Sequence, residues 1–170
     1  MLRISSGLLA VTLVLPFAGA AGAQGVINQP RISAHLANQL VGDSVANCAK
    51  QGYKVVAVVV DLNGVRQALL RGDGAPIHSM DNAYYKAYSA ASLTLGRGEG
   101  STKEIADRMA KAAPSTVPQT PLPNVTYAVG GVVLKSGGTA IGGLGVSGAP
   151  GGQFDEACAR EAMAKIPELK

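Results

Sequence analysis

Residues 55–60 read Val-Val-Ala-Val-Val-Val, and this run constrains the fold more than any other part of the chain. β-Branched side chains favour strands, and the run is too short to span a membrane. An apolar run that does not alternate with polar residues is typical of a strand buried on both faces. We therefore predict a central strand with other elements packed on each side of it.

The run is followed by a turn sequence. Asn63 and Gly64 form the dipeptide with the strongest preference for a short hairpin turn, because both residues tolerate positive φ angles. Residues 65–71 are predicted to return as an antiparallel strand. Residues 72–76 read Gly-Asp-Gly-Ala-Pro, and a proline at this place fits the first turn of a helix. We predict that helix over about residues 77–95.

Further helices and strands are predicted on both sides of this stretch. Apolar residues recur at three- and four-residue steps between Pro30 and Gly52, which predicts the first helix. Ser101 and Glu104 form a capping box for a short helix. A last helix is predicted over residues 153–166. The remaining strand segments are predicted at residues 125–129, 131–135 and 140–146.

Hairpins join most of these strands, and a hairpin pairs its strands antiparallel. Four helices and about five strands predict an α+β architecture, with a single antiparallel sheet flanked by helices. Residues 114–124 contain four prolines and cannot sustain a helix or a central strand. We predict that this segment is a rigid loop on the surface.

The first 23 residues have the pattern of a secretory signal peptide. Arg3 supplies a positive charge, residues 4–18 are mainly apolar, and residues 21–23 are small. A membrane anchor is the alternative, but the apolar run is shorter than the roughly 20 residues that a spanning helix needs. We predict a signal peptide at residues 1–23, one domain at residues 24–170, a secreted or periplasmic location, and no membrane span.

The charge pattern argues against a nucleic-acid partner. The chain has 15 Lys and Arg residues against 11 Asp and Glu, a formal net charge of +4, and the basic residues are scattered. A nucleic-acid surface needs clustered cations and usually aromatic side chains on which bases stack. The chain has no tryptophan and few other aromatic residues, so we expect no nucleic-acid binding.

Cys48 and Cys158 are the two cysteines of the chain, and both fall on predicted helices. In an oxidising compartment, a disulfide between them is favoured over two separately buried thiols. Neither cysteine belongs to a C-x-x-C pair, so a zinc site is not expected.

Residues 143–148 match the G-x-G-x-x-G pattern of dinucleotide-binding proteins. Such a site also needs a later strand with an acidic residue, and the chain ends first. The glycines therefore predict close backbone packing or a glycine-lined pocket wall. Ser147 does not lie in a G-x-S-x-G sequence, so a serine nucleophile is poorly supported.

The order of these motifs resembles the GlcG/HbpS family, which also forms the C-terminal domain of PduO-type proteins. The resemblance covers nearly all of residues 24–170 and implies a profilin-like fold of the α+β type. It rests on the hairpin, the Gly-Asp-Gly-Ala-Pro sequence and the glycine-rich strand. The family-matched positions are Asp73, Gly74, Lys86, Gly143, Gly145, Ser147, Gly148 and Asp155.

The resemblance implies haem as the cofactor, because the family includes extracellular haem-binding proteins, some discussed as haem-degrading and some as haem-dependent sensors. We therefore predict a secreted haem-binding protein in which haem degradation or sensing is a further activity. The alternative is a scaffold, or an enzyme acting on a small organic acid without haem. The resemblance also implies a homo-oligomer and allows a membrane-bound sensor partner.

An axial ligand of haem iron could come from a histidine, a methionine or a tyrosine. We favour His35 and place His78 second, ahead of Met80 and Met109. The alternative for His35 is a histidine at the side of a helix that bonds to water or to a carbonyl group. The haem propionates would pair with Lys86, Arg66 or Arg71.

Tyr84 and Tyr85 stand where relatives generally carry small or acidic residues. Their rings could stack on a planar ligand or fill a subunit interface, and we favour the interface slightly. The predicted haem contacts are therefore His35, His78, Lys86, Tyr84, Tyr85 and Asp73, with His35 as the metal ligand.

Overall fold

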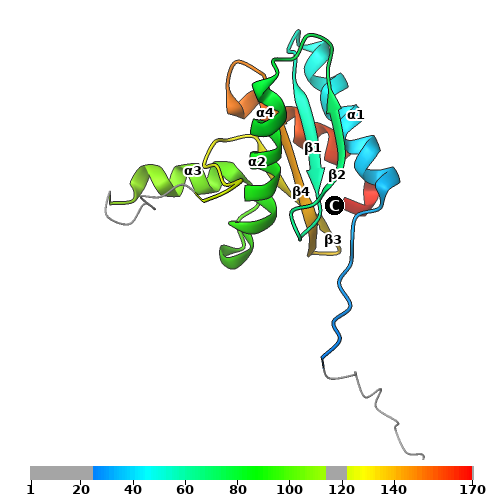
Figure 1. Ribbon diagram of the computed structural model, residues 1–170, viewed down its shortest axis with the longest axis vertical. Helices are drawn as coiled ribbons and strands as arrows, with labels where there is room; N and C mark the ends of the chain where they lie inside the picture. The colour runs from blue at the N-terminus through cyan, green and yellow to red at the C-terminus, as the bar shows by residue number, and fades with distance from the viewer. Residues whose placement is uncertain (1–24, 114–121, 170) are drawn as a thin grey trace, which may run out of the picture.

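Strand β1 (Val56–Val60) lies inside a four-stranded antiparallel sheet, and all of its residues are buried (Figure 1). The computed structural model describes residues 25–113 and 122–169. The predicted signal peptide lies outside these ranges, as do residues 114–121 of the predicted proline-rich loop. Burial of β1 on both faces is as expected from its unbroken apolar sequence.

The order of the strands across the sheet is β2, β1, β4, β3, where β2 is Arg66–Arg71, β3 is Gly131–Ser136 and β4 is Thr139–Ser147. All neighbouring strands pair antiparallel. The predicted hairpin at Asn63 and Gly64 joins β1 to β2. The predicted α+β architecture with one antiparallel sheet is therefore confirmed.

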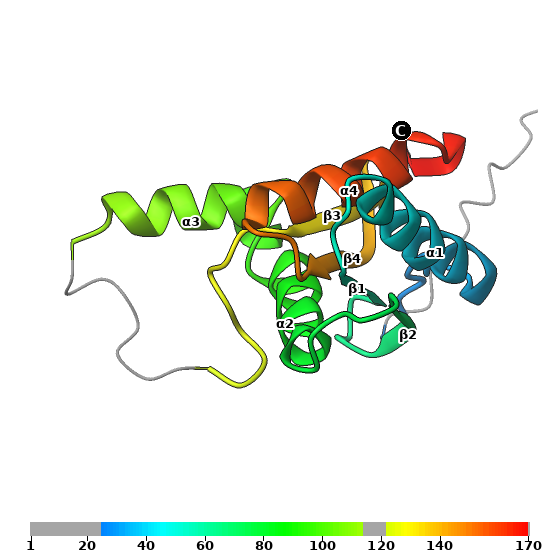
Figure 2. The same ribbon diagram turned by 90° about the horizontal axis from the view of Figure 1, so that it is seen from above.

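Helices cover both faces of the sheet (Figure 2). One face carries α1 (Ala34–Lys50) and α4 (Gly152–Ala164), and the other carries α2 (His78–Ser92). A fourth helix, α3 (Thr102–Lys111), projects beside these layers. Side chains of β1 alternate between the two layers, so Val56 and Val58 pack toward α2 while Ala57 and Val59 pack toward α1 and α4.

Gly143 and Gly145 allow α2 to lie directly on β4. A Cβ atom on Gly145 would overlap the carbonyl oxygen of Ala83, and one on Gly143 would overlap that of Ala87. These glycines therefore provide close backbone packing, the first of the two roles predicted for the glycine-rich strand.

Cys48 and Cys158 form the predicted disulfide, which joins α1 to α4. Their Cα atoms are 5.5 Å apart, and the bond closes a sequence separation of 110 residues. The chain-entropy model assigns roughly 4–5 kcal/mol to a loop of this length. The disulfide is thus a covalent link between α1 and α4, which lie on the same face of the sheet.

Two elements differ from the sequence expectation. Helix α1 begins after Ser33 rather than near Pro30, because the Ser33 hydroxyl accepts a hydrogen bond from the Leu36 N–H at 3.2 Å. Residues 125–129 are not in a strand, and the N–H of Thr126 donates instead to Ser89 Oγ on α2 at 2.8 Å. Among the helices in the described ranges, none has the length and apolar character that crossing a membrane requires.

Candidate functional site

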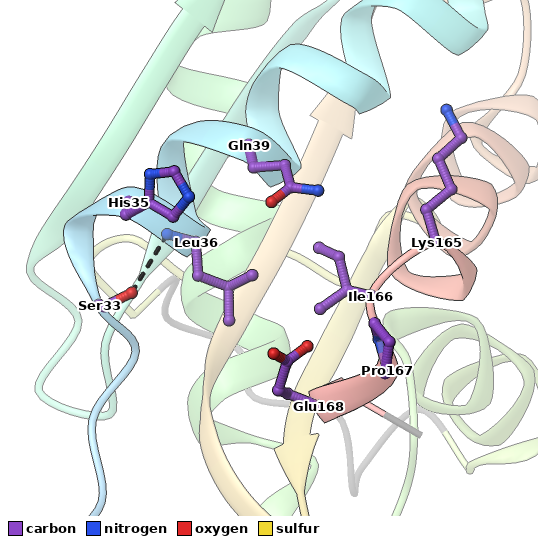
Figure 3. A pocket seen from close by; sticks show the side chains of 8 residues that line it. All are labelled: Ser33, His35, Leu36, Gln39, Lys165, Ile166, Pro167 and Glu168. Atoms are coloured by element: carbon purple, nitrogen blue, oxygen red, sulfur yellow. Dashed lines mark hydrogen bonds between the residues drawn. The ribbon is translucent and has the colours of Figure 1, made fainter.

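A pocket opens between the first turn of α1 and the chain that follows α4 (Figure 3). Its volume is about 420 Å³, which falls within the range of small-molecule sites. The lining residues are Ser33, His35, Leu36, Gln39, Lys165, Ile166, Pro167 and Glu168. We call this site the His35 pocket.

His35 lies in the first turn of α1 and is exposed. Within residues 25–113 and 122–169, neither nitrogen of its ring has a hydrogen-bond partner. A carbonyl partner, the alternative considered for this histidine, is therefore not found among the described residues. The imidazole is free to bind water or an external ligand.

The apolar part of the pocket comes from both of its walls. Leu36 on α1 and Ile166 after α4 point toward each other in Figure 3, and Pro167 continues the second wall. The Glu168 carboxylate and the Gln39 amide add polar groups beside them. An apolar surface with a few convergent polar groups is the usual composition of a site for an organic ligand.

Lys165 is the cation among the described lining residues, and its ammonium group is held by α1. Its Nζ donates to Asn47 Oδ1 at 3.0 Å and lies 3.3 Å from Asp43 Oδ1. No local sequence signal marks Lys165, because a lysine at the end of an amphipathic helix is normally solvated. Its approach to α1 depends on the tertiary packing of α1 against α4.

The other predicted contacts do not join His35. His78 is the exposed first residue of α2 and lines none of the pockets described here. Asp73 lines a separate pocket of about 310 Å³ with Tyr53 and Lys54. Roles for His78 and Asp73 in ligand binding stay predictions.

Tyr84 and Tyr85 lie on α2, on the opposite face of the sheet from α1. The Arg66 guanidinium stacks 3.6 Å from the centre of the Tyr84 ring, and the Tyr84 hydroxyl donates to the Gly64 carbonyl at 3.2 Å. Tyr85 packs beside Tyr84 with ring centres 5.8 Å apart. Within this chain, Tyr84 therefore fastens α2 to the β1–β2 hairpin.

Lys86 lies in the interior, where its ammonium group bridges α2, β4 and α4. Its Nζ is 2.8 Å from Asp155 Oδ2 and donates to the Val146 carbonyl at 3.0 Å. The side chains of Lys86 and Asp155 are only 4% and 3% exposed. Gly130 makes room for the pair, since a Cβ there would lie 2.9 Å from Lys86 Nζ. A ligand role for Lys86 stays a prediction, and the structure gives the ammonium two protein partners.

Burial raises the pKa of the Asp155 carboxyl above its ordinary value of 3.8. The nearby Lys86 ammonium, and the Ala149 N–H that donates to Oδ1 at 3.0 Å, oppose the shift. The folded state therefore binds this proton more tightly than the unfolded state does. It follows that the contribution of Asp155 to the free energy of unfolding falls as the pH rises from 3.8 through the raised pKa.

No group of three or more His, Cys, Asp or Glu side chains that could hold a bare metal ion occurs in the described ranges. The site chemistry of the His35 pocket is instead one free imidazole beside an apolar surface. That combination suits a ligand that brings its own metal within an organic ring.

Residues 32–164 match the sequence model of a family described as haem-degrading protein, HbpS-like. The structure of HbpS is similar, with 31% identity and a TM-score of 0.74 over 87% of this chain and 99% of that chain. A PduOC complex with haem has 28% identity and a TM-score of 0.70 over 81% of this chain and 96% of that chain.

A third similar structure is the protein ORFY from Klebsiella pneumoniae, with 25% identity and a TM-score of 0.73 over 88% of this chain and 100% of that chain. No curated protein sequence matched the chain.

Proposed function

Because the chain belongs to the HbpS-like family, we propose that it binds haem in the His35 pocket, where the His35 imidazole would hold the iron. One observation carries the choice of site. The sequence contains two histidines, and of these only His35 lines a pocket described here. The complex of a similar PduOC structure with haem supports the choice of ligand.

The residues of the pocket fit such a group. The free His35 ring provides a nitrogen ligand, and Leu36, Ile166 and Pro167 provide an apolar surface for a flat macrocycle. Lys165 also lines the pocket, but its Nζ is bound to Asn47 and Asp43, so pairing of the propionates with Lys86, Arg66 or Arg71 stays a prediction. When bound, haem would supply iron that exchanges ligands and electrons, which no side chain in this pocket supplies.

Each side chain would then have a limited task. His35 would hold the iron, and the apolar residues would exclude water from one face of the ring. We propose that this binding takes place outside the cytoplasm, which is supported by the signal-peptide pattern of residues 1–23. Degradation of the haem and haem-dependent sensing, in a homo-oligomer, are the further activities that we propose.

A haemin titration followed by absorbance tests this proposal. We expect a saturable Soret shift with about one haem per chain for the purified protein and for the His78→Ala variant. His35→Ala should lose the shift, or weaken binding by at least about tenfold, because the axial ligand is removed. His78 is the matched control, since it is the other histidine and is equally exposed on a helix.

Two results would count against the proposal. Identical curves for all three proteins would mean that the imidazole of His35 does not bind the iron. Loss of the shift in His78→Ala alone would move the site to the first turn of α2.

A further inference from the structure

The described residues that line the His35 pocket come from the start of α1 and from the chain that follows α4, and a disulfide connects these two helices. The first wall comes from residues 33–39 at the start of α1, and the second from residues 165–168 after α4. The described lining residues include none from the sheet or from α2. The shape of the pocket therefore depends on how α1 and α4 are held together.

Two links join α1 to α4 in addition to their apolar contacts. The first is the Cys48–Cys158 disulfide, next to which Asn47 Nδ2 donates to the Cys158 carbonyl at 3.5 Å. The second is Lys165, whose Nζ reaches Asn47 Oδ1 at 3.0 Å and Asp43 Oδ1 at 3.3 Å. Asn47 is buried and hydrogen-bonds in both links, to the Cys158 carbonyl and to Lys165, so the two links form one connected unit.

This unit includes part of the pocket wall. Lys165 is itself a lining residue, and Ile166, the next residue, is buried in the same core as Cys48 and Cys158. The final turn, η3 (Pro167–Leu169), ends the second wall and contacts α4 and β3, and its Leu169 is buried in that core as well.

We propose that the Cys48–Cys158 disulfide is coupled to ligand binding at the His35 pocket, so that the pocket is competent when the disulfide is formed. The inference rests on the proposed function, because it concerns the same site. A dithiol reductant would deliver two electrons and two protons. The S–S bond then breaks, Cys48 and Cys158 become thiols, and the reductant closes into its own disulfide.

The disulfide would act by raising the fraction of molecules in which the pocket is formed and able to bind. Without the disulfide, the end of α4 is held to α1 by the contacts of Lys165 with Asn47 and Asp43 and by apolar packing. A pocket that is formed for part of the time binds its ligand more weakly by that fraction. Because coupling between two sites is reciprocal, the bound ligand must in turn oppose reduction of the disulfide.

Both sulfur atoms are completely buried, which sets how reduction proceeds. A reductant reaches them only when α1 and α4 separate, and this motion also removes the pocket. The arrangement would confine ligand uptake to an oxidising compartment, where the disulfide forms. A chain still in a reducing compartment would bind the ligand weakly.

Gallium(III) protoporphyrin IX, which has no accessible change of metal oxidation state, is the probe for the first test. We expect the Cys48→Ala/Cys158→Ala variant to bind it at least about tenfold more weakly than the unaltered protein, at a temperature where circular dichroism shows both folded. Ile105→Ala is the matched control. It removes buried atoms on α3, away from the pocket, and we expect it to destabilise the fold to a comparable degree.

The second test measures the reciprocal effect. The protein is treated with dithiothreitol, and new thiols are alkylated and counted by mass. We expect the porphyrin to slow thiol formation several-fold in the unaltered protein and not in His35→Ala.

Equal affinity for the unaltered protein and the double cysteine variant would overturn the coupling and leave haem binding intact. A loss of affinity in Ile105→Ala equal to that in the double cysteine variant would do the same. Absence of porphyrin binding to the unaltered protein would overturn the proposed function and the coupling together.

Discussion

Replacing Lys86 with methionine is expected to lower the free energy of unfolding by about 3–5 kcal/mol. The substitution keeps most of the side-chain volume but leaves the Asp155 carboxylate without its cation, in a place where its side chain is 3% exposed. It also leaves the Val146 carbonyl without its donor. Urea denaturation at neutral pH measures the loss.

The loss should shrink as the pH falls, because Asp155 then becomes neutral and no longer needs the ammonium group. The double variant Lys86→Met/Asp155→Leu should recover most of the stability, since an apolar pair can replace a buried ion pair. Lys103→Met is the control. It breaks the exposed pair with Asp107 and should change stability little. A small effect of Lys86→Met would show that the buried pair does not hold α2, β4 and α4 together.

Gly145→Ala is expected to destabilise the protein by about 3 kcal/mol. The new methyl group would overlap the Ala83 carbonyl and lie 2.5 Å from the Ala87 nitrogen, and both belong to the backbone of α2. Backbone atoms cannot move aside as the end of a flexible side chain can, so α2 must shift from the sheet. Thermal unfolding of the purified variant measures the effect.

Gly42→Ala provides the matched control for this substitution. Gly42 lies inside α1, and a Cβ there would have no heavy atom within 4 Å. Alanine is the better helix former by about 0.8–1.0 kcal/mol, so this variant should be more stable than the unaltered protein. If both variants behaved alike, close packing of α2 on β4 would not explain the glycine-rich strand.

The sequence predicts the fold well because local signals set most of it. The valine run, the Asn63-Gly64 turn and the Ser101 cap each specify a structure within a few residues, and all three are present. The disulfide is predicted because a chain with two cysteines allows only one intramolecular bond. Residues 125–129 do not form a strand, and the Thr126 N–H instead donates to the Ser89 side chain, 37 residues earlier, a contact that no local signal indicates.

The candidate site is less accessible to sequence reasoning, because its parts come together only through tertiary packing. Lys165 and Asp43 are 122 residues apart, and Lys86 and Asp155 are 69 apart. A lysine carries no local signal that distinguishes a buried ion pair from a ligand contact. The sequence therefore named Lys86 among the candidates for the propionates, whereas in the structure its ammonium pairs with Asp155 in the interior.

We propose that His35 holds the haem iron, and diffraction at the iron absorption edge from crystals grown with haemin would locate the metal. We expect the strongest anomalous peak at bonding distance from a ring nitrogen of His35, between α1 and the end of α4. A peak elsewhere, with the His35 ring unbound, would rule out His35 as the ligand of the iron.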